Sequence, residues 1–252
     1  MAVTSDLWIF LTIVALASWF QAVTGFGLGL IVIALGTTLA VSGVPELAAV
    51  ISLLALVNVV TSLGGHWRSV YRAMWLPVTA GQVLGIPVGV WLLLVLAEDY
   101  TRLVEILLGL FVLAGSASMI WSARPGARLA STPEFAVAGF AGGVVGGMFA
   151  ASAPVLGYVG YRQPLPAEAI RATLLACFGV TTLVRTTVIG AGGGLTEEVL
   201  QRAALAIPLV VVVSFLGTRY RPPLDEISLR RFAFLALSLS GIWLIGNGLL
   251  RS

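Results

Sequence analysis

Long apolar runs separated by short charged connectors make up most of the chain. A helix that spans a membrane needs about 20 mostly apolar residues, because the hydrocarbon core is about 30 Å thick and a helix rises about 1.5 Å per residue. The pattern predicts simple spans at Leu47–Gly64, Ala73–Leu96, Leu103–Trp121, Glu168–Ile189, Val199–Gly217 and Phe232–Leu250. We therefore expect an all-α integral membrane protein.

Two further apolar segments do not fit a single span. Leu7–Gly43 carries no charge and would be about 55 Å long as one straight helix. Phe135–Tyr161 has small residues at its centre, and its Pro154 lacks a backbone donor. We expect each segment to form two short helices that meet at a break, in a hairpin that returns to its starting face. Counting each hairpin as two spans gives about eight transmembrane helices. Because unpaired backbone at membrane depth needs protein or a water-filled cavity around it, both breaks are candidate sites.

The composition excludes several classes of protein. With 59% hydrophobic and 10% charged residues, the chain is too apolar for a soluble enzyme, a nucleic-acid-binding module or a disordered segment. A single cysteine, Cys177, excludes an intramolecular disulfide, and one His and one Cys cannot form a usual zinc site. The sequence also lacks a phosphate-binding loop and a nucleophile elbow. We therefore predict no enzyme activity, cofactor, metal or nucleic-acid partner.

The basic residues predict the orientation of the chain. All 14 are arginines, and they lie one or two at a time between apolar runs, as in membrane loops. If both hairpins return to their starting faces, most arginines collect on one side, which is then cytoplasmic. Asp6, Glu46, Glu98 and Glu197 fall on the other side with few arginines. The prediction is a multi-pass bacterial inner-membrane protein, in contact with membrane lipid, with both termini in the periplasm.

The same segments repeat along the chain. We predict repeat one at residues 1–121 (hairpin 7–43 and three helices), a cytoplasmic linker at 122–134, and repeat two at 135–252 (hairpin 135–161 and three helices). Pro45-Glu-Leu-Ala resembles Pro166-Ala-Glu-Ala, and Trp75-Leu-Pro77 resembles Ala206-Ile-Pro208. Repeat one begins outside and repeat two inside, so their topologies are inverted. Inverted repeats with broken helices are typical of secondary transporters, whose site lies near the midplane.

Polar residues at the breaks are the candidate ligands of a small anion. Opened helix ends expose N–H groups that favour anions, although close packing accounts for the individual glycines equally well. Arg185 lies among threonines and either faces a polar cavity or extends its charge to the interface. Asn58 and Gln82 are isolated amides that either bind a ligand or join helices. The predicted substrate-binding residues are Gln21, Thr24, Gly25, Phe26, Gly27, Asn58, Ser152, Ala153, Pro154, Thr181 and Arg185.

An ordered set of motifs resembles the TauE/SafE family of sulfite and organosulfonate exporters. The motifs are Phe20-Gln-Ala-Val-Thr-Gly-Phe-Gly-Leu-Gly29, Pro45-x-x-Ala-x-x-x-Ser52, His66-Trp-Arg68, the Ala138–Gly147 stretch that leads to Ser152-Ala-Pro154, and Pro166-x-x-Ala-x-x-Ala-Thr173. Family members often carry a Gly-Gly-rich stretch before the proline of the second hairpin, where this chain reads Ala150-Ala-Ser-Ala153. The resemblance implies export of a small sulfur oxyanion or sulfonate, such as sulfite or sulfoacetate.

Together these features predict a secondary transporter that exports a small sulfur-containing anion by alternating access. An anion channel in the same cavity and a non-transporting membrane scaffold or assembly factor are the alternatives. The identity of the anion, the coupling ion and the formation of a homo-oligomer stay open. Among the 29 glycines, the two clusters at the expected breaks are the best indication of where an anion binds.

Overall fold

The computed structural model describes residues 2–24, 27–63, 67–121, 126, 128–219 and 226–250. All elements in these ranges are helical. They are α1 (Ala2–Thr24), α2 (Leu28–Thr38), α3 (Val44–Leu63), the 3-10 turn η1 (Trp67–Ser69), α4 (Arg72–Asp99), α5 (Thr101–Trp121), α6 (Thr132–Phe149), α7 (Ala153–Tyr161), α8 (Ala167–Ala191), α9 (Glu197–Arg219) and α10 (Glu226–Leu250).

The long helices follow the predicted spans to within a few residues. α3, α4, α5, α8, α9 and α10 cover the six apolar runs, so the all-helical prediction is confirmed for the described residues. Five of the described helices are long and apolar enough to cross a membrane, namely α1, α3, α4, α8 and α9. The count of eight transmembrane helices stays a prediction.

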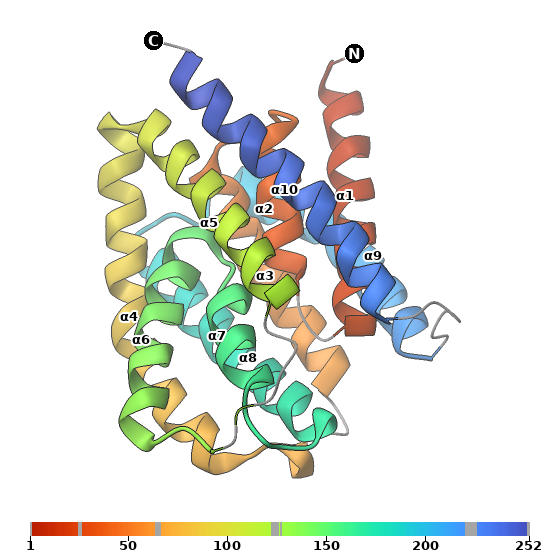
Figure 1. Cartoon of the computed structure of the whole chain (residues 1–252). Coiled ribbons are helices and arrows are strands. Elements are labelled where there is room, and N and C mark those ends of the chain that lie inside the picture. Colours follow the sequence, from red (N-terminus) through yellow and green to blue (C-terminus); the bar gives the residue numbers. More distant parts are fainter. Residues whose placement is uncertain are drawn as a thin grey trace.

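Each long uncharged segment is divided into a longer and a shorter helix. Figure 1 shows α1 descending from the end of the molecule that carries both termini, and the shorter α2 returning toward that end. α6 and α7 are arranged in the same way from the opposite end (Figure 1). With 11 and 9 residues, α2 and α7 are only about 16 and 14 Å long, so the N-terminus of each lies inside the bundle.

The second break lies at a different place from the glycine cluster. The sequence predicted that the glycine cluster and Ser152 both lie at this break, but α6 runs without interruption to Phe149, so the break falls at Ala150–Ser152 and includes only Ser152. The α6 glycines serve packing instead. A Cβ on Gly139 or Gly147 would overlap a backbone carbonyl of α4, and one on Gly85 of α4 would overlap the carbonyl of Phe140. Small residues at four-residue spacing allow helix backbones to approach this closely.

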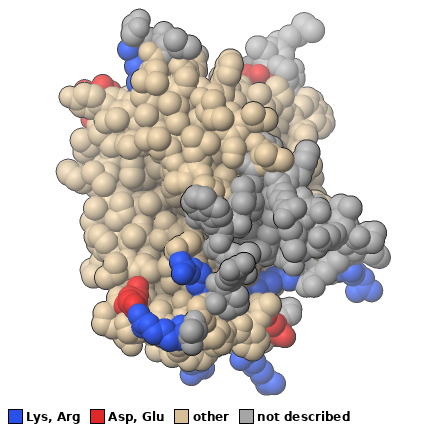
Figure 2. Space-filling view, in the orientation of Figure 1, with Lys and Arg blue, Asp and Glu red and all other residues tan. Residues whose placement is uncertain are grey.

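The helix contacts in one half of the chain have counterparts in the other half, if α1 to α5 are taken as the equivalents of α6 to α10 in order. α4 packs on α6 as α9 packs on α1, α3 contacts α9 as α8 contacts α4, and α2 contacts α10 as α7 contacts α5. Two related halves of opposite topology would produce this pairing, and the repeat itself stays a prediction. Figure 2 shows most arginines of the visible face gathered at the end opposite the termini.

Candidate functional site

The two breaks meet in the middle of the molecule around a small cavity. Its volume is about 30 Å³. Gly29 packs so tightly on the second break that a Cβ there would overlap the carbonyl oxygen of Ala150. The lining residues are Gln21, Gly27, Gly29, Leu30, Ala55, Ala150, Ala151, Ser152, Ala153, Phe178, Thr181 and Thr182. We call this space the central cavity.

Two helix N-termini border the central cavity. Gly27 caps α2 with a φ of 112°, a conformation that glycine adopts without a steric penalty. Gly29 lies in the first turn of α2, and Ser152 and Ala153 begin α7. The first N–H groups of a helix lack intrahelical partners and carry partial positive charge. The cavity is therefore suited to an anion, and the side chains that line it carry no formal charge.

A chain of buried amides holds the first break in place. The Oε1 atom of Gln21 accepts the N–H of Leu28 at 2.9 Å, so it bridges the end of α1 and the start of α2. Gln21 Nε2 donates to Asn58 Oδ1 at 2.7 Å, and Asn58 Nδ2 donates to Ser214 Oγ at 2.7 Å. Gln21 lines the central cavity, whereas Asn58 lies behind it and joins α3 to α9.

A second polar chain reaches the cavity at the second break. Ser152 Oγ lies 3.2 Å from Thr181 Oγ1, and both residues line the cavity. Gln82 Nε2 donates to Thr181 Oγ1 and to the carbonyl of Cys177, the latter at 3.2 Å. Gln82 Oε1 is buried, and no residue in the described part of the chain donates a hydrogen bond to it. The structure thus links Ser152 to α4 through Thr181, although the amide of Gln82 does not itself line the cavity.

Arg185 lies outside the central cavity. Its side chain is 1% exposed, so the interpretation that it extends to the interface is wrong. Its Nε donates to the carbonyl of Gly147 at 2.8 Å, and one Nη donates to Ser52 Oγ at 2.6 Å and to the carbonyl of Ala48. Because Gly147 lies in the last turn of α6, Arg185 satisfies a carbonyl at a helix C-terminus.

Arg171 makes the equivalent contact to the first hairpin. Its Nη2 donates to the carbonyl of Ala22 at 2.7 Å, in the last turn of α1. α8 therefore carries two arginines that bind the C-terminal carbonyls of α1 and α6. These carbonyls carry partial negative charge, which a guanidinium offsets. The sequence indicated Arg185 as a charged residue in a span, but its acceptors, two backbone carbonyls and the Ser52 hydroxyl, lie far away along the chain.

The remaining candidates differ in what the structure shows of them. Gly25 and Phe26 lie outside the described residues. Thr24 is the last residue of α1, and the structure does not describe its side chain. Pro154 begins α7 and packs against Gly115 of α5, where a Cβ would lie 2.9 Å from its ring. Thr182, adjacent to the predicted Thr181, lines the cavity but donates its hydroxyl to the carbonyl of Phe178 at 3.0 Å. In the described part of the chain, no three His, Cys, Asp or Glu residues are grouped as metal ligands.

Comparison with known proteins shows the family of the chain. The profile of the family described as "Sulfite exporter TauE/SafE" matches residues 10–244. A protein of Cupriavidus necator named "Probable sulfite/organosulfonate exporter TauE" is 37% identical over 222 residues, which cover 86% of this chain and 85% of the relative. No solved structure matches the chain. The family match and the apolar helices show a multi-pass membrane protein of a transporter family. The chain belongs to the sulfite exporter TauE/SafE family.

Proposed function

We propose that this protein is a secondary transporter that exports a small sulfur oxyanion or organosulfonate through the central cavity. The observation that carries the proposal is the meeting of two helix N-termini, those of α2 and α7, at one buried polar cavity. Two partial positive charges at one point favour an anion without a fixed cation. The name of the Cupriavidus necator relative and the family description support the substrate class.

Within this proposal Ser152 is the main side-chain donor to the anion. Gln82 donates to Thr181, so the Thr181 oxygen already accepts a hydrogen bond. Thr181 lies within hydrogen-bond distance of both Ser152 and the Cys177 carbonyl. When Thr181 donates to Ser152, the Ser152 proton is free to point into the cavity and bind an anionic oxygen. Hydrogen bonds to charged acceptors are about twice as strong as neutral ones.

Transport then requires the two breaks to move apart. A cavity of about 30 Å³ holds one or two water molecules, and sulfite with its four heavy atoms needs more space. Rocking of one half of the bundle against the other would open the cavity alternately to each side. An inside-negative potential assists the outward step by about 2.3 kcal/mol per charge per 100 mV, so proton coupling is not required for export of an anion.

The proposal is tested by anion flux in proteoliposomes that contain the purified protein. We expect saturable flux of sulfite or sulfoacetate and accelerated exchange when anion is present on both sides. Ser152→Ala is expected to lower the affinity about tenfold through loss of one charge-assisted hydrogen bond. Ser116→Ala is the matched control, because Ser116 is equally buried on α5 and does not line the central cavity.

Three results would contradict the proposal. Absence of saturable flux for every sulfur oxyanion and sulfonate tested would remove the transporter function and leave the scaffold alternative. Flux that rises linearly with concentration, without exchange, would show a channel. Equal flux through Ser152→Ala and Ser116→Ala would remove the central cavity as the binding site.

A further inference from the structure

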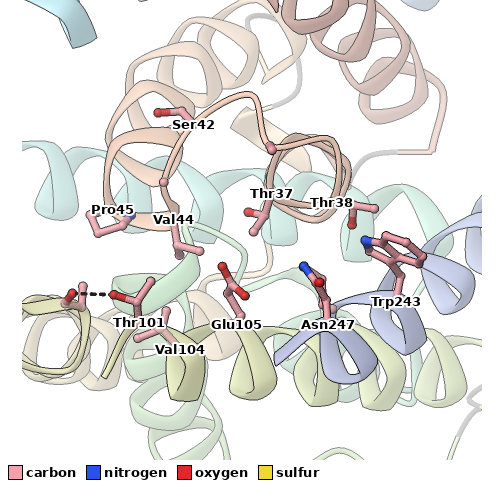
Figure 3. Close-up of a pocket in the computed structure, with 14 residues that line it drawn as sticks. Thr37, Thr38, Ser42, Val44, Pro45, Thr101, Val104, Glu105, Trp243 and Asn247 are labelled. Atoms are coloured by element: carbon pink, nitrogen blue, oxygen red, sulfur yellow. Dashed lines mark hydrogen bonds between the residues drawn. The ribbon is translucent and has the colours of Figure 1, made fainter. Parts of the chain in front are cut away.

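A second and larger cavity lies at the other end of α2. Its volume is about 430 Å³. The C-terminal end of α2, the start of α3, the turn between α4 and α5, and the last turns of α10 enclose it. Figure 3 shows the Glu105 side chain of α5 and the Asn247 side chain of α10 pointing from one wall toward α2. We call this space the α2–α10 cavity, and the proposed export site does not include it.

The α2–α10 cavity is electronegative. Glu105 is the one charged residue among the described residues of its lining, and no hydrogen bond or ion pair joins its carboxylate to a described residue. On the opposite wall, the hydroxyl oxygens of Thr37 and Thr38 are buried and have no hydrogen-bond partner among the described residues. Both threonines lie in the last turn of α2, where the helix dipole is negative. A carboxylate, unpaired hydroxyls and a helix C-terminus together favour a cation.

The lining matches an organic cation better than a metal ion. A hard metal ion needs about six oxygen ligands, often from several carboxylates, and this cavity has a single carboxylate. Much of the wall is apolar, including Val104 and Leu244. The volume lies within the usual range for small-molecule sites. An ammonium group can donate to oxygens while its carbon chain packs on apolar side chains.

We propose that the α2–α10 cavity binds a small organic ammonium ion. The ammonium N–H groups donate to the carboxylate of Glu105 and to the hydroxyl oxygens of Thr37 and Thr38. The alkyl part packs against Val104 and Leu244. Such an ion has two sources, a free amine in solution or the ethanolamine headgroup of a neighbouring lipid.

Calorimetric titration of the full chain in detergent tests the proposal without any transport assay, so its failure is separate from failure of the export function. Propylammonium is the probe, and 1-propanol and sodium ions are the neutral and metal comparisons. We expect saturable binding of propylammonium alone. Glu105→Gln is expected to weaken this binding at least about tenfold, because it removes the charge of the acceptor. Glu98→Gln is the matched control, since Glu98 is an exposed carboxylate at the end of α4 that does not line the cavity.

Nanodiscs distinguish the two sources. Loss of propylammonium binding in phosphatidylethanolamine discs, with binding retained in phosphatidylglycerol discs, assigns the site to the lipid headgroup. Equal binding in both lipids assigns it to a free amine. Absence of saturable binding, equal competition by sodium, or unchanged affinity in a folded Glu105→Gln variant would each overturn the proposal.

Discussion

The two hairpins enclose the same cavity, but their longer helices pack on the neighbouring helices in different ways. Polar side chains hold the first break, where Gln21 bridges α1 and α2 and Asn58 ties it to α9. The second hairpin has polar contacts as well, through Ser152 and through Arg185, but the glycines of α4 and α6 also bring the backbones of these two helices into direct contact. The equivalent α1–α9 contact at Gly217 meets the Ala22 and Trp19 side chains instead. We infer that α6 moves together with α4, whereas α1 has more freedom to shift against α9.

Substitution in the glycine contact between α4 and α6 has the largest expected effect. Overpacking costs about 1–3 kcal/mol where side chains can yield, but Gly85 faces a backbone carbonyl that cannot. We expect Gly85→Leu to remove folded protein from detergent extracts, measured by size-exclusion yield. Gly246→Ala is the control, because nothing lies within 4 Å of a Cβ there. A normal yield of Gly85→Leu would show that the second hairpin is not held by this contact.

Loss of the Arg185 side chain is next in size. Arg185→Gln leaves the carbonyl of Gly147 without its side-chain donor, and an unsatisfied buried group costs about 1–3 kcal/mol, whereas the carbonyl of Ala48 still accepts from Ser52 Oγ. We expect a lower unfolding temperature with little change in anion affinity. Arg68→Gln, at an exposed position in η1, is the control. Unchanged stability together with weaker anion binding would return Arg185 to the substrate-binding residues.

The amide chain of the first hairpin is tested by a double-mutant cycle. Asn58→Ala and Gln21→Ala should each destabilise the protein by about 1–3 kcal/mol, because each leaves buried partners unsatisfied. The double variant should lose less than the sum, since the two residues share one hydrogen bond. Thermal unfolding in detergent measures all three variants. If the losses of stability in the two single variants add up to the loss in the double variant, the two amides act independently and do not form one hydrogen-bonded network at the first break.

Ala150 offers a stabilising substitution at the second break. Its φ of 53° lies in the left-handed region, which costs a residue with a Cβ about 1–2 kcal/mol. Ala150→Gly should raise the free energy of unfolding by about 0.5–1 kcal/mol, because the relief of this strain exceeds the cost of the larger conformational entropy that glycine has in the unfolded chain. Ala151→Gly, at a buried neighbour without a positive φ, should instead destabilise. Thermal unfolding compares the two variants, and destabilisation by both would argue against strain at Ala150.

The smallest effect concerns the start of α6, just before the apolar segment Phe135–Tyr161. Arg128 donates to Glu134 at 2.8 Å and Ser131 completes a capping box, which together lower the pKa of Glu134 from 4.5 to about 2. A lowered pKa means that the carboxylate stabilises the fold above pH 4.5 and that this contribution is lost between about pH 4.5 and 2. Glu134→Gln should flatten the pH dependence of the unfolding temperature there, and an unchanged slope would show that the contact is too exposed to matter.

The sequence by itself determined the long helices, and it predicted the region of the candidate site. Apolar runs of membrane length located the long helices, and the uncharged Leu7–Gly43 was too long to be one span, so it had to be divided. Gln21 and Ser152 were predicted because polar groups close to a break in an apolar helix usually face the protein interior or a water-filled cavity, and Thr181 because it lies one helical turn from Arg185. These inferences depend on local composition and length, which the sequence contains in full.

Only the tertiary structure decided which groups meet. Glycine supports both a helix break and a close helix contact, and the partner backbone of α4 determines that the α6 glycines serve the second purpose. In the same way, the acceptors of Arg185 are carbonyls of α3 and α6, and Thr37, Glu105 and Asn247 share a cavity although they lie on three separate helices. Every residue has a backbone carbonyl, and the type and spacing of residues do not show which distant segments become neighbours. The contacts of a polar side chain are therefore known only when the packing of the helices is known.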